Sequence, residues 1–246
     1  MLEARGLGKY YSGIPAVKNV NFTLARGGVL GLLGPNGSGK STTVSMVTSL
    51  LEPTTGQILL DGQSISRAPL EYKARIGYVP EEAHLYTYLT GPEYLELVGQ
   101  LRGVSQRVLA EKISSFMRIF GLEDDRYAPM SAYSKGMRQK ILIAAALLHD
   151  PDVVILDEPN SGLDVTSTLV LRSLVQQLGA GRQDGALQLA RAGDGGECRD
   201  RCDDPARLER GRARFSVTPA RAHGPAVSRT GFQESGPRGG RRPGCR

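Results

Sequence analysis

The feature that most constrains this chain is the sequence of residues 34–41, Gly-Pro-Asn-Gly-Ser-Gly-Lys-Ser, which fits the pattern G-x-x-x-x-G-K-[ST]. The apolar stretch Val29–Leu33 precedes it and the helical pattern Thr42–Leu51 follows it, so the glycines lie where a strand turns into a helix. Such a turn directs backbone N–H groups at phosphate oxygens, and the helix N-terminus adds a favourable dipole. The alternative is a glycine-rich turn without a function. We expect a phosphate site lined by Gly34, Pro35, Asn36, Gly37, Ser38, Gly39, Lys40, Ser41 and Thr42.

Two of these side chains have specific expected roles. Lys40 can reach the β- and γ-phosphates of a nucleotide, and the hydroxyl of Ser41 can bind Mg²⁺. A second motif supports this interpretation, because Asp157 and Glu158 directly follow the apolar run 153–156. Open α/β sheets bind ligands at the carboxyl ends of their strands. We therefore expect Asp157 to hold Mg²⁺ through water and Glu158 to polarise the attacking water.

Short apolar runs alternate with helical patterns over the first 181 residues, which is typical of an α/β fold with a mostly parallel sheet covered on both sides. Residues 85–149 differ, because three helical patterns follow one another there without a strand. Pro92 marks the start of the first helix, and Ser105 and Ser134 are candidate caps for the other two. The sequence thus predicts an α/β core with a helical subdomain at about 85–149.

The composition changes at about residue 181. Residues 1–181 carry 17 basic and 17 acidic side chains, whereas residues 182–246 carry 14 Arg, no Lys and 8 acidic side chains. The entire net charge of +6 therefore lies in the second part. Leu, Val and Phe total seven of its 65 residues, and Ile, Tyr and Met are absent. Because so few apolar residues cannot build a core, we expect residues 182–246 to form an Arg/Gly-rich, largely disordered tail.

These motifs resemble those of the ATP-binding subunits of ABC transporters, over residues 2–179. Tyr11 matches the aromatic residue that stacks on adenine in that family, Tyr10 is an alternative for the role, and Val17 would flank the same ring. The segment 77–82, Gly-Tyr-Val-Pro-Glu-Glu, matches the loop between the catalytic core and the helical subdomain. The family usually has Gln at the position of Glu81, and the carboxylate of Glu81 can still contact Mg²⁺ or water.

Two further loops resemble family motifs that contact the second subunit. Residues 133–137, Tyr-Ser-Lys-Gly-Met, match the signature loop usually written L-S-G-G-Q. Ser134 and Gly136 are kept there, whereas Lys135 and Met137 depart from the pattern. The resemblance implies that Ser134 and Gly136 touch the γ-phosphate of ATP held by the opposite subunit. Residues 160–164 match the loop that contacts the partner subunit, and this implies a role for Asp164 at the shared ATP site.

The resemblance implies a P-loop ATPase that uses ATP and Mg²⁺, with Glu158 and Lys40 as its catalytic residues. It also implies a head-to-tail pair of ATP-binding subunits at the inner face of the cell membrane, with a membrane permease as partner. The context of Glu81 is similar to that of subunits that work with ABC-2-type permeases. We expect no membrane span in this chain, because its longest apolar run, Ile141–Leu148, is only eight residues. We expect no nucleic-acid partner.

The resemblance ends after about residue 181. The family continues with a strand, a switch histidine and further strands, and the sequence predicts none of these here. His223 is the only histidine after Asp164, and no apolar strand precedes it. One hypothesis is a change of reading frame near residues 180–182. Codons compatible with residues 182–197, read one base later, encode G-K-M-V-L-Y-S-S-H-V-L-E-M-V-E, which has a strand, a histidine and a helix start. The gene's nucleotide sequence decides this hypothesis.

Other readings of the tail and of the whole chain remain open. An Arg-rich segment can bind RNA or anionic lipid. Cys198 and Cys202 with His223 are too scattered to indicate a zinc site. For the whole chain, the leading hypothesis is the ATPase subunit of a transporter, impaired by the missing switch histidine and strands. The alternatives are a non-catalytic ATP-binding remnant and a soluble ABC-type ATPase that does not act in transport.

Overall fold

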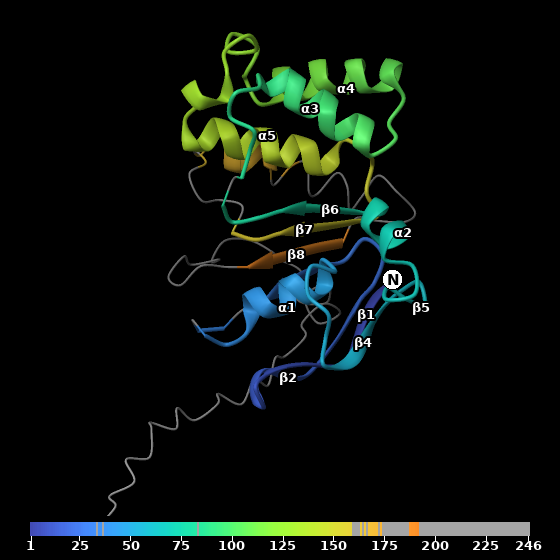
Figure 1. The fold of residues 1–246 in the computed structure, drawn as a ribbon. Coiled ribbons are helices and arrows are strands. Elements are labelled where there is room, and N and C mark those ends of the chain that lie inside the picture. Colours follow the sequence, from blue (N-terminus) through green and yellow to red (C-terminus); the bar gives the residue numbers. More distant parts are fainter. Residues whose placement is uncertain are drawn as a thin grey trace, which may run out of the picture.

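The computed structural model describes residues 1–32, 34–35, 37–82, 84–158, 163, 165, 167–171, 173 and 187–191. Two β-sheets and a group of helices make up this part of the chain (Figure 1). In chain order the elements are β1 (Leu2–Tyr11), β2 (Ile14–Leu24), β3 (Val29–Leu32), α1 (Lys40–Val47), β4 (Thr55–Leu60), β5 (Gln63–Ser64), α2 (Pro69–Ala74), β6 (Ile76–Val79), α3 (Gly91–Leu101), α4 (Gln106–Ile119), the 3₁₀ turn η1 (Met130–Ala132), α5 (Lys135–Leu147), β7 (Val153–Leu156) and β8 (Leu187–Arg191).

The first sheet is antiparallel, with the strand order β2-β1-β4-β5. Its hairpin between β1 and β2 turns at Ser12 and Gly13, whose φ angles are 49° and 81°. Two successive positive φ angles suit the tight two-residue turn of a twisted hairpin. The expectation of one mostly parallel sheet is wrong for this half of the fold. The strand β1 and the turn at Ser12 and Gly13 were not predicted from the sequence.

The second sheet is parallel, with the strand order β3-β8-β7-β6. Alternate residues of β7 serve two hydrophobic cores, because successive side chains of a strand point to opposite faces. Val153 and Ile155 join the core that contains α1 and the antiparallel sheet, whereas Val154 and Leu156 join the core beneath the helical group. The predicted covering of the parallel sheet on both faces is therefore confirmed (Figure 1).

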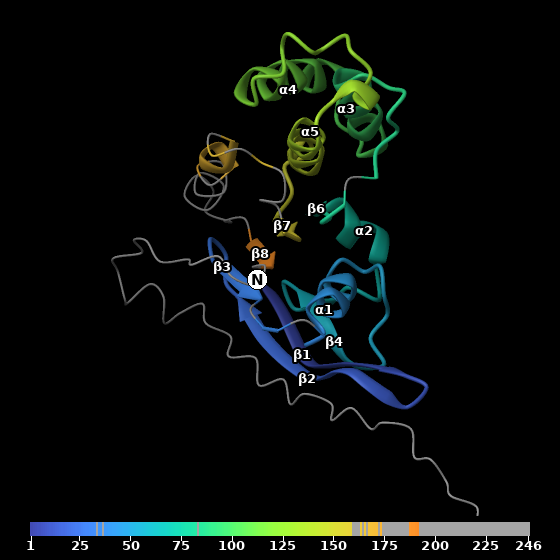
Figure 2. The same ribbon diagram turned by 90° about the vertical axis from the view of Figure 1, so that its left-hand side faces the viewer.

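The expectation that no strand follows residue 179 is wrong for one segment. The strand β8, Leu187–Arg191, lies between β3 and β7 and pairs in parallel with both (Figure 2). The pattern Leu-Gln-Leu-Ala-Arg alternates apolar and polar residues only briefly, within a stretch of low apolar content. This short signal was lost in an argument from the average composition of the tail. Residues 182–186 and 192–246 lie outside the described residues.

The helices α3, α4 and α5 pack together on one face of the parallel sheet (Figure 1). Thr90 caps α3 through a reciprocal pair of hydrogen bonds with Glu93. The helix α4 begins after Ser105 as the sequence predicts, but the side chain of Ser105 makes no capping hydrogen bond. The helix α5 comes so close to β6 that a Cβ added at Gly77 would lie 2.2 Å from the carbonyl oxygen of Ala146. Glycine at this position allows the helix to lie against the strand.

In the part of the chain that the structure describes, no helix has both the length and the apolar character needed to cross a membrane.

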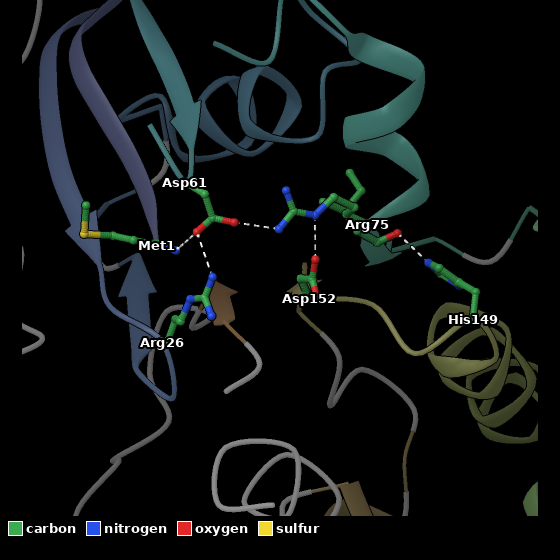
Figure 3. A network of polar contacts seen from close by, with 7 residues as sticks. Met1, Arg26, Asp61, Arg75, His149 and Asp152 are labelled. Atoms are coloured by element: carbon green, nitrogen blue, oxygen red, sulfur yellow. Dashed lines mark hydrogen bonds and ion pairs between the residues drawn. The ribbon is translucent and has the colours of Figure 1, made fainter. Parts of the chain in front are cut away.

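A network of polar contacts joins the two sheets at the amino ends of the parallel strands (Figure 3). Asp61, which follows β4, accepts a hydrogen bond of 2.5 Å from the α-ammonium of Met1 and one of 2.6 Å from Arg75. Arg75, which precedes β6, also donates to Asp152 at 2.6 Å, directly before β7. Arg26 lies 3.4 Å from Asp61. The network ties the antiparallel sheet to the starts of two parallel strands.

Asp61 shows the electrostatic effect of this network most clearly. The hydrogen bond from the α-ammonium of Met1 and that from Arg75 hold the pKa of the Asp61 carboxyl well below its usual range, although burial acts in the opposite direction. His149, two residues after the end of α5, adds a contact of 2.9 Å between its Nε2 and the carbonyl oxygen of Ile76. Burial is the main cause that lowers the pKa of His149 and thus favours the neutral ring.

Candidate functional site

The predicted phosphate loop and acidic residues leave the parallel sheet at the same edge. The register pairs Leu32 of β3 with Arg191, and it pairs Leu156 of β7 with Ala190 on one side and with Val79 of β6 on the other. The phosphate loop begins after β3, Asp157 directly follows β7, and Glu81 lies two residues beyond β6. In a parallel sheet this edge, formed by the carboxyl ends of the strands, is where ligands bind.

Gly39 shapes the end of the phosphate loop. Its φ of +87° is left-handed, and a Cβ at this position would lie 2.6 Å from the carbonyl oxygen of Ala16 and 2.8 Å from Cγ2 of Val17. Any other residue would therefore be strained there and would collide with β2. The helix α1 begins at the next residue, Lys40, so the N–H groups of its first turn lie at the mouth of the loop.

Lys40 is buried and folds back along its own loop. Its ammonium donates to the carbonyl oxygens of Gly34 and Pro35, the latter at 2.9 Å. An ammonium group has three donors, so Lys40 can bind a phosphate oxygen with the third or exchange these two carbonyls for phosphate oxygens. Either way, the positive charge is held at the loop where the sequence places it.

The other loop residues form a partly exposed rim. Pro35 and Gly37 are exposed and Ser38 is partly buried, with its N–H donating to the carbonyl oxygen of Pro35 at 3.2 Å. Ser41 is exposed in the first turn of α1, and Thr42 beside it is partly buried. The exposed hydroxyl of Ser41 suits a metal ligand. Asn36 lies outside the described residues.

The acidic motif combines one buried and one partly buried carboxylate. Asp157 is buried, and its backbone N–H donates to the carbonyl oxygen of Val79 at 2.9 Å, which continues the pairing of β7 with β6 by one residue. Glu158 is partly buried and has a φ of +49°, unusual for a residue with a side chain. The chain thus turns sharply where β7 ends, at the residue predicted to polarise water.

Tyr78 of β6 belongs to this group, and the sequence argument gave it no role. Burial raises the pKa of the Tyr78 phenol, and the charges of Asp157 and Glu81 raise it further. Both carboxylates therefore act on the same phenol, although Glu81 itself is exposed. The available signal was the place of Tyr78 in β6, on the same face as Ile76, which packs in the core that contains α1.

The residues at this edge fit a hard cation bound together with phosphate. Asp157, Glu81 and Ser41 all offer oxygen ligands, which Mg²⁺ prefers, and Mg²⁺ commonly takes one or two carboxylates together with phosphate oxygens and water. Among the described residues, no group of three or more His, Cys, Asp or Glu could hold a metal ion by itself. The donor set is thus suited to a metal that arrives with a phosphate ligand.

The hairpin β1–β2 connects the predicted adenine site to the phosphate loop. Tyr11 is 51% exposed near the tip of this hairpin, and the ammonium of Lys9 lies 5.6 Å from the centroid of its ring. Lys9 pairs with Val17, whose buried side chain lies beside Gly39. Tyr10 is partly buried. Tyr11 therefore has an accessible ring on which a base could stack. Val17 packs against the phosphate loop at Gly39.

The signature loop, residues 133–137, lies apart from the phosphate loop. Ser134 caps α5 by accepting from the N–H of Met137 at 3.2 Å, and α5 packs on the face of the parallel sheet opposite to α1. Tyr133, where the resembled motif has Leu, is buried and donates to the carbonyl oxygen of Asp125 at 2.9 Å. Ser134 is exposed and Gly136 is partly buried. The structure thus assembles the phosphate loop, Asp157, Glu158 and Glu81 at one edge and leaves Ser134 and Gly136 apart; Asp164 lies outside the described residues.

Comparisons with known proteins agree with this arrangement. The family model described as ABC transporter matches residues 17–161. The ABC transporter ATP-binding protein NatA of Bacillus subtilis (strain 168) is 42% identical over 166 residues, which are 67% of this chain and 68% of NatA. Further curated relatives from the same organism are matched over 57% to 75% of their own length.

Solved structures give the same result for the fold. The structure of an ATP-binding subunit of an ABC transporter superposes with a TM-score of 0.72 at 33% identity, covering 78% of this chain and 79% of that one. The ABC transporter cassette MJ0796, solved as a dimer, superposes with a TM-score of 0.69 at 25% identity, covering 77% of this chain and 88% of that one. The expected P-loop ATPase core is therefore confirmed.

Proposed function

Since the chain belongs to the ABC transporter family and carries its ATPase domain, we propose that it is the ATP-hydrolysing subunit of a transporter and energises substrate movement by a membrane permease. One observation carries this proposal. The phosphate loop after β3 and the pair Asp157–Glu158 after β7 leave the parallel sheet at one edge, in one register. This is the arrangement that positions a nucleotide phosphate against a water-activating carboxylate.

The residues at this edge divide the chemistry among them. The N–H groups of the loop and the ammonium of Lys40 bind the β- and γ-phosphates and offset the negative charge that develops on them. Glu158 orients and polarises the attacking water. Ser41, Asp157 and Glu81 would hold Mg²⁺, which when bound would neutralise further charge at the phosphates.

Adenine stacks on the exposed ring of Tyr11. The ammonium of Lys9 makes a cation–π contact with the same ring and helps to hold it in place. Ser134 and Gly136 act on the ATP of a second, identical or similar subunit, and Asp164 acts at the same interface. Two facts support a head-to-tail pair of subunits. The signature loop lies across the sheet from this chain's own phosphate loop, and the similar cassette MJ0796 was solved as a dimer.

The permease is proposed from the relatives, whose names describe transporter ATP-binding proteins. A subunit of this kind lies on the inner face of the cell membrane, bound to its permease. The Gly-Tyr-Val-Pro-Glu context of Glu81 favours a permease of the ABC-2 type. We expect slow turnover, because no histidine other than His223 follows Asp164 in the sequence to act as the γ-phosphate switch.

The test uses the purified full chain. Binding of a fluorescent ATP analogue is measured by titration with and without Mg²⁺, and hydrolysis is measured by phosphate release. The Lys40→Ala variant removes the phosphate contact, and Lys73→Ala, in α2, is the matched control. We expect Lys40→Ala to weaken binding at least about tenfold, as the loss of a charge-assisted contact predicts, and Lys73→Ala to leave it unchanged.

Three outcomes would contradict parts of the proposal. Binding that is equal in the wild type and Lys40→Ala would show that the phosphate loop does not hold the nucleotide. Hydrolysis as fast as that of complete transporter ATPases would contradict the expected slow turnover. Failure to co-purify with any multi-spanning membrane protein from detergent-solubilised membranes would contradict the role in transport while leaving the ATPase role intact.

A further inference from the structure

The strand β8 occupies the centre of the parallel sheet although it comes from the part of the chain beyond the family match. Its five residues pair with β3 on one side and β7 on the other, with Gln188 opposite both Val29 and Val154 and with Ala190 opposite both Gly31 and Leu156. The family model ends at residue 161, and β8 begins at Leu187. The central strand thus lies outside the segment that the family model matches.

No other described strand connects β3 to the rest of the parallel sheet, because the order is β3-β8-β7-β6. Neighbouring strands lie about 4.8 Å apart, so β3 and β7 are separated by roughly twice that distance. A gap of that width cannot be bridged by direct backbone hydrogen bonds. The phosphate loop extends from β3 and the acidic pair from β7, so their mutual position depends on the strand between them.

We propose that residues 187–191 are a positioning element of the ATP site, which holds the phosphate loop and Asp157–Glu158 in register through backbone pairing on both sides. The Arg/Gly-rich tail is then required for nucleotide binding through this one segment. This inference rests on the proposed function, because one of its two measurements is nucleotide binding. The other measurement, of backbone pairing, needs no nucleotide.

The local sequence is consistent with a short strand bounded by turns. Leu187 and Leu189 alternate with Gln188, while Asp-Gly at 184–185 and Gly-Asp-Gly-Gly at 193–196 lie on either side. Within a tail of low apolar content, this is a segment in which an apolar residue recurs at every second position. It therefore has the pattern that a strand in a sheet requires.

The experiment uses the full chain with a proline in β8. Gln188→Pro removes a backbone donor and fixes φ, both of which a central strand does not tolerate. Gln233→Pro is the matched control in the tail away from β8, and Gln188→Thr is a second variant that keeps the backbone donor and favours a strand. Amide hydrogen exchange is measured without nucleotide, and binding of a fluorescent ATP analogue is measured with Mg²⁺.

We expect Gln188→Pro to accelerate exchange of β3 and β7 at least about tenfold, the effect of losing about one backbone hydrogen bond, while the β1–β2 hairpin keeps its protection. ATP-analogue binding weakens by a similar factor. Gln188→Thr and Gln233→Pro match the wild type in both measurements. The proposal is overturned if Gln188→Pro exchanges and binds as the wild type does, or if it loosens β1–β2 as much as β3 and β7.

The outcome separates this inference from the proposed function. If wild type and Lys40→Ala bind nucleotide equally, the proposed function fails, yet exchange of β3 and β7 still tests β8. If nucleotide binding depends on Lys40 but not on Gln188→Pro, the ATPase role stands and the positioning role of β8 is refuted.

Discussion

The two ends of the parallel strands arrange their charged side chains in opposite ways. At the amino ends, Arg75 donates to Asp61 and to Asp152, each at 2.6 Å, and the α-ammonium of Met1 donates to Asp61. At the carboxyl ends, burial raises the pKa of Tyr78, and the charges of Asp157 and the exposed Glu81 raise it further. Opposite charges meet at the first edge, and carboxylates gather at the second.

The difference shows what each edge is suited to do. An edge whose charges are mutually paired lowers the energy of the folded chain and has little charge left for a ligand. An edge at which carboxylates lie next to a loop that carries a lysine is stabilised most when a cation and phosphates bind there. We therefore expect substitutions at the carboxyl edge to change activity more than stability, and substitutions at the amino edge to do the reverse.

The largest expected effect is at the carboxyl edge. Glu158→Gln keeps the shape of the side chain but removes the carboxylate that polarises water, so phosphate release should fall about 100-fold or more while ATP binding persists. The measurement is phosphate release with saturating MgATP, beside a binding titration. Glu71→Gln, on α2, is the control, and an unchanged rate in Glu158→Gln would remove this residue from the chemistry.

The next effect lies between the two edges, in the middle of β6. Gly77→Ala places a Cβ 2.2 Å from the carbonyl oxygen of Ala146, so α5 must move away from the sheet. We expect a loss of about 2 kcal/mol in the free energy of unfolding, measured by urea denaturation. Gly31→Ala is the matched control, because a Cβ there meets no atom of the described residues within 4 Å. Equal stability of the two variants would show that the approach of α5 to β6 is not tight.

A smaller effect is expected at the amino edge. Arg75→Ala breaks two ion pairs whose side chains are 30% to 41% exposed, so the expected loss is about 1 kcal/mol of unfolding free energy. Hydrolysis per folded molecule should stay within about twofold of the wild type if this edge serves stability alone. The exposed Arg67→Ala is the control, and a hydrolysis defect in Arg75→Ala larger than its stability defect would undermine the comparison of the two edges.

The smallest effect concerns pH. The pKa of Asp61 is lower in the folded than in the unfolded chain, so its contribution to stability is fully present above about pH 4, its unfolded value, and is lost as the pH falls below it. Asp61→Asn should therefore be less stable than the wild type at pH 6 by about 1 kcal/mol or less, and the difference should shrink below pH 4. Urea denaturation across this range measures it, and a difference that grows on acidification would reverse the assigned sign.

Much of the site could be predicted because its motifs are local. The loop 34–41 is recognised by glycines and a lysine at fixed spacing between a strand and a helix. Asp157 and Glu158 directly follow an apolar strand. The start of α5 was also visible, because the cap that Ser134 forms depends on neighbouring residues. The start of α4 after Ser105 was predicted correctly as well, although Ser105 makes no side-chain capping bond. The raised pKa of Tyr78 was not visible, because it depends first on burial and then on carboxylates that follow two separate strands.

The predictions were wrong where strands are defined by pairing with distant residues, or where the composition of a long segment was averaged. The antiparallel sheet was missed because β1 is defined by its pairing with β2 and β4, not by a strong pattern of its own. The strand β8 was missed because composition was averaged over a long tail. The place of Val17 beside Gly39 was also not visible, because only coordinates place its side chain, and its contact with the adenine ring stays a prediction.

By itself, the sequence determined that this chain has a phosphate loop, an acidic strand end and a neutral core joined to a basic tail. These properties depend on residue types at short spacing, where covalent connection fixes the neighbours. Only the tertiary structure decided that Arg75 joins two sheets and that the tail supplies the central strand between β3 and β7. Such contacts join residues far apart in the chain, and their partners are chosen by packing and strand pairing and not by local sequence.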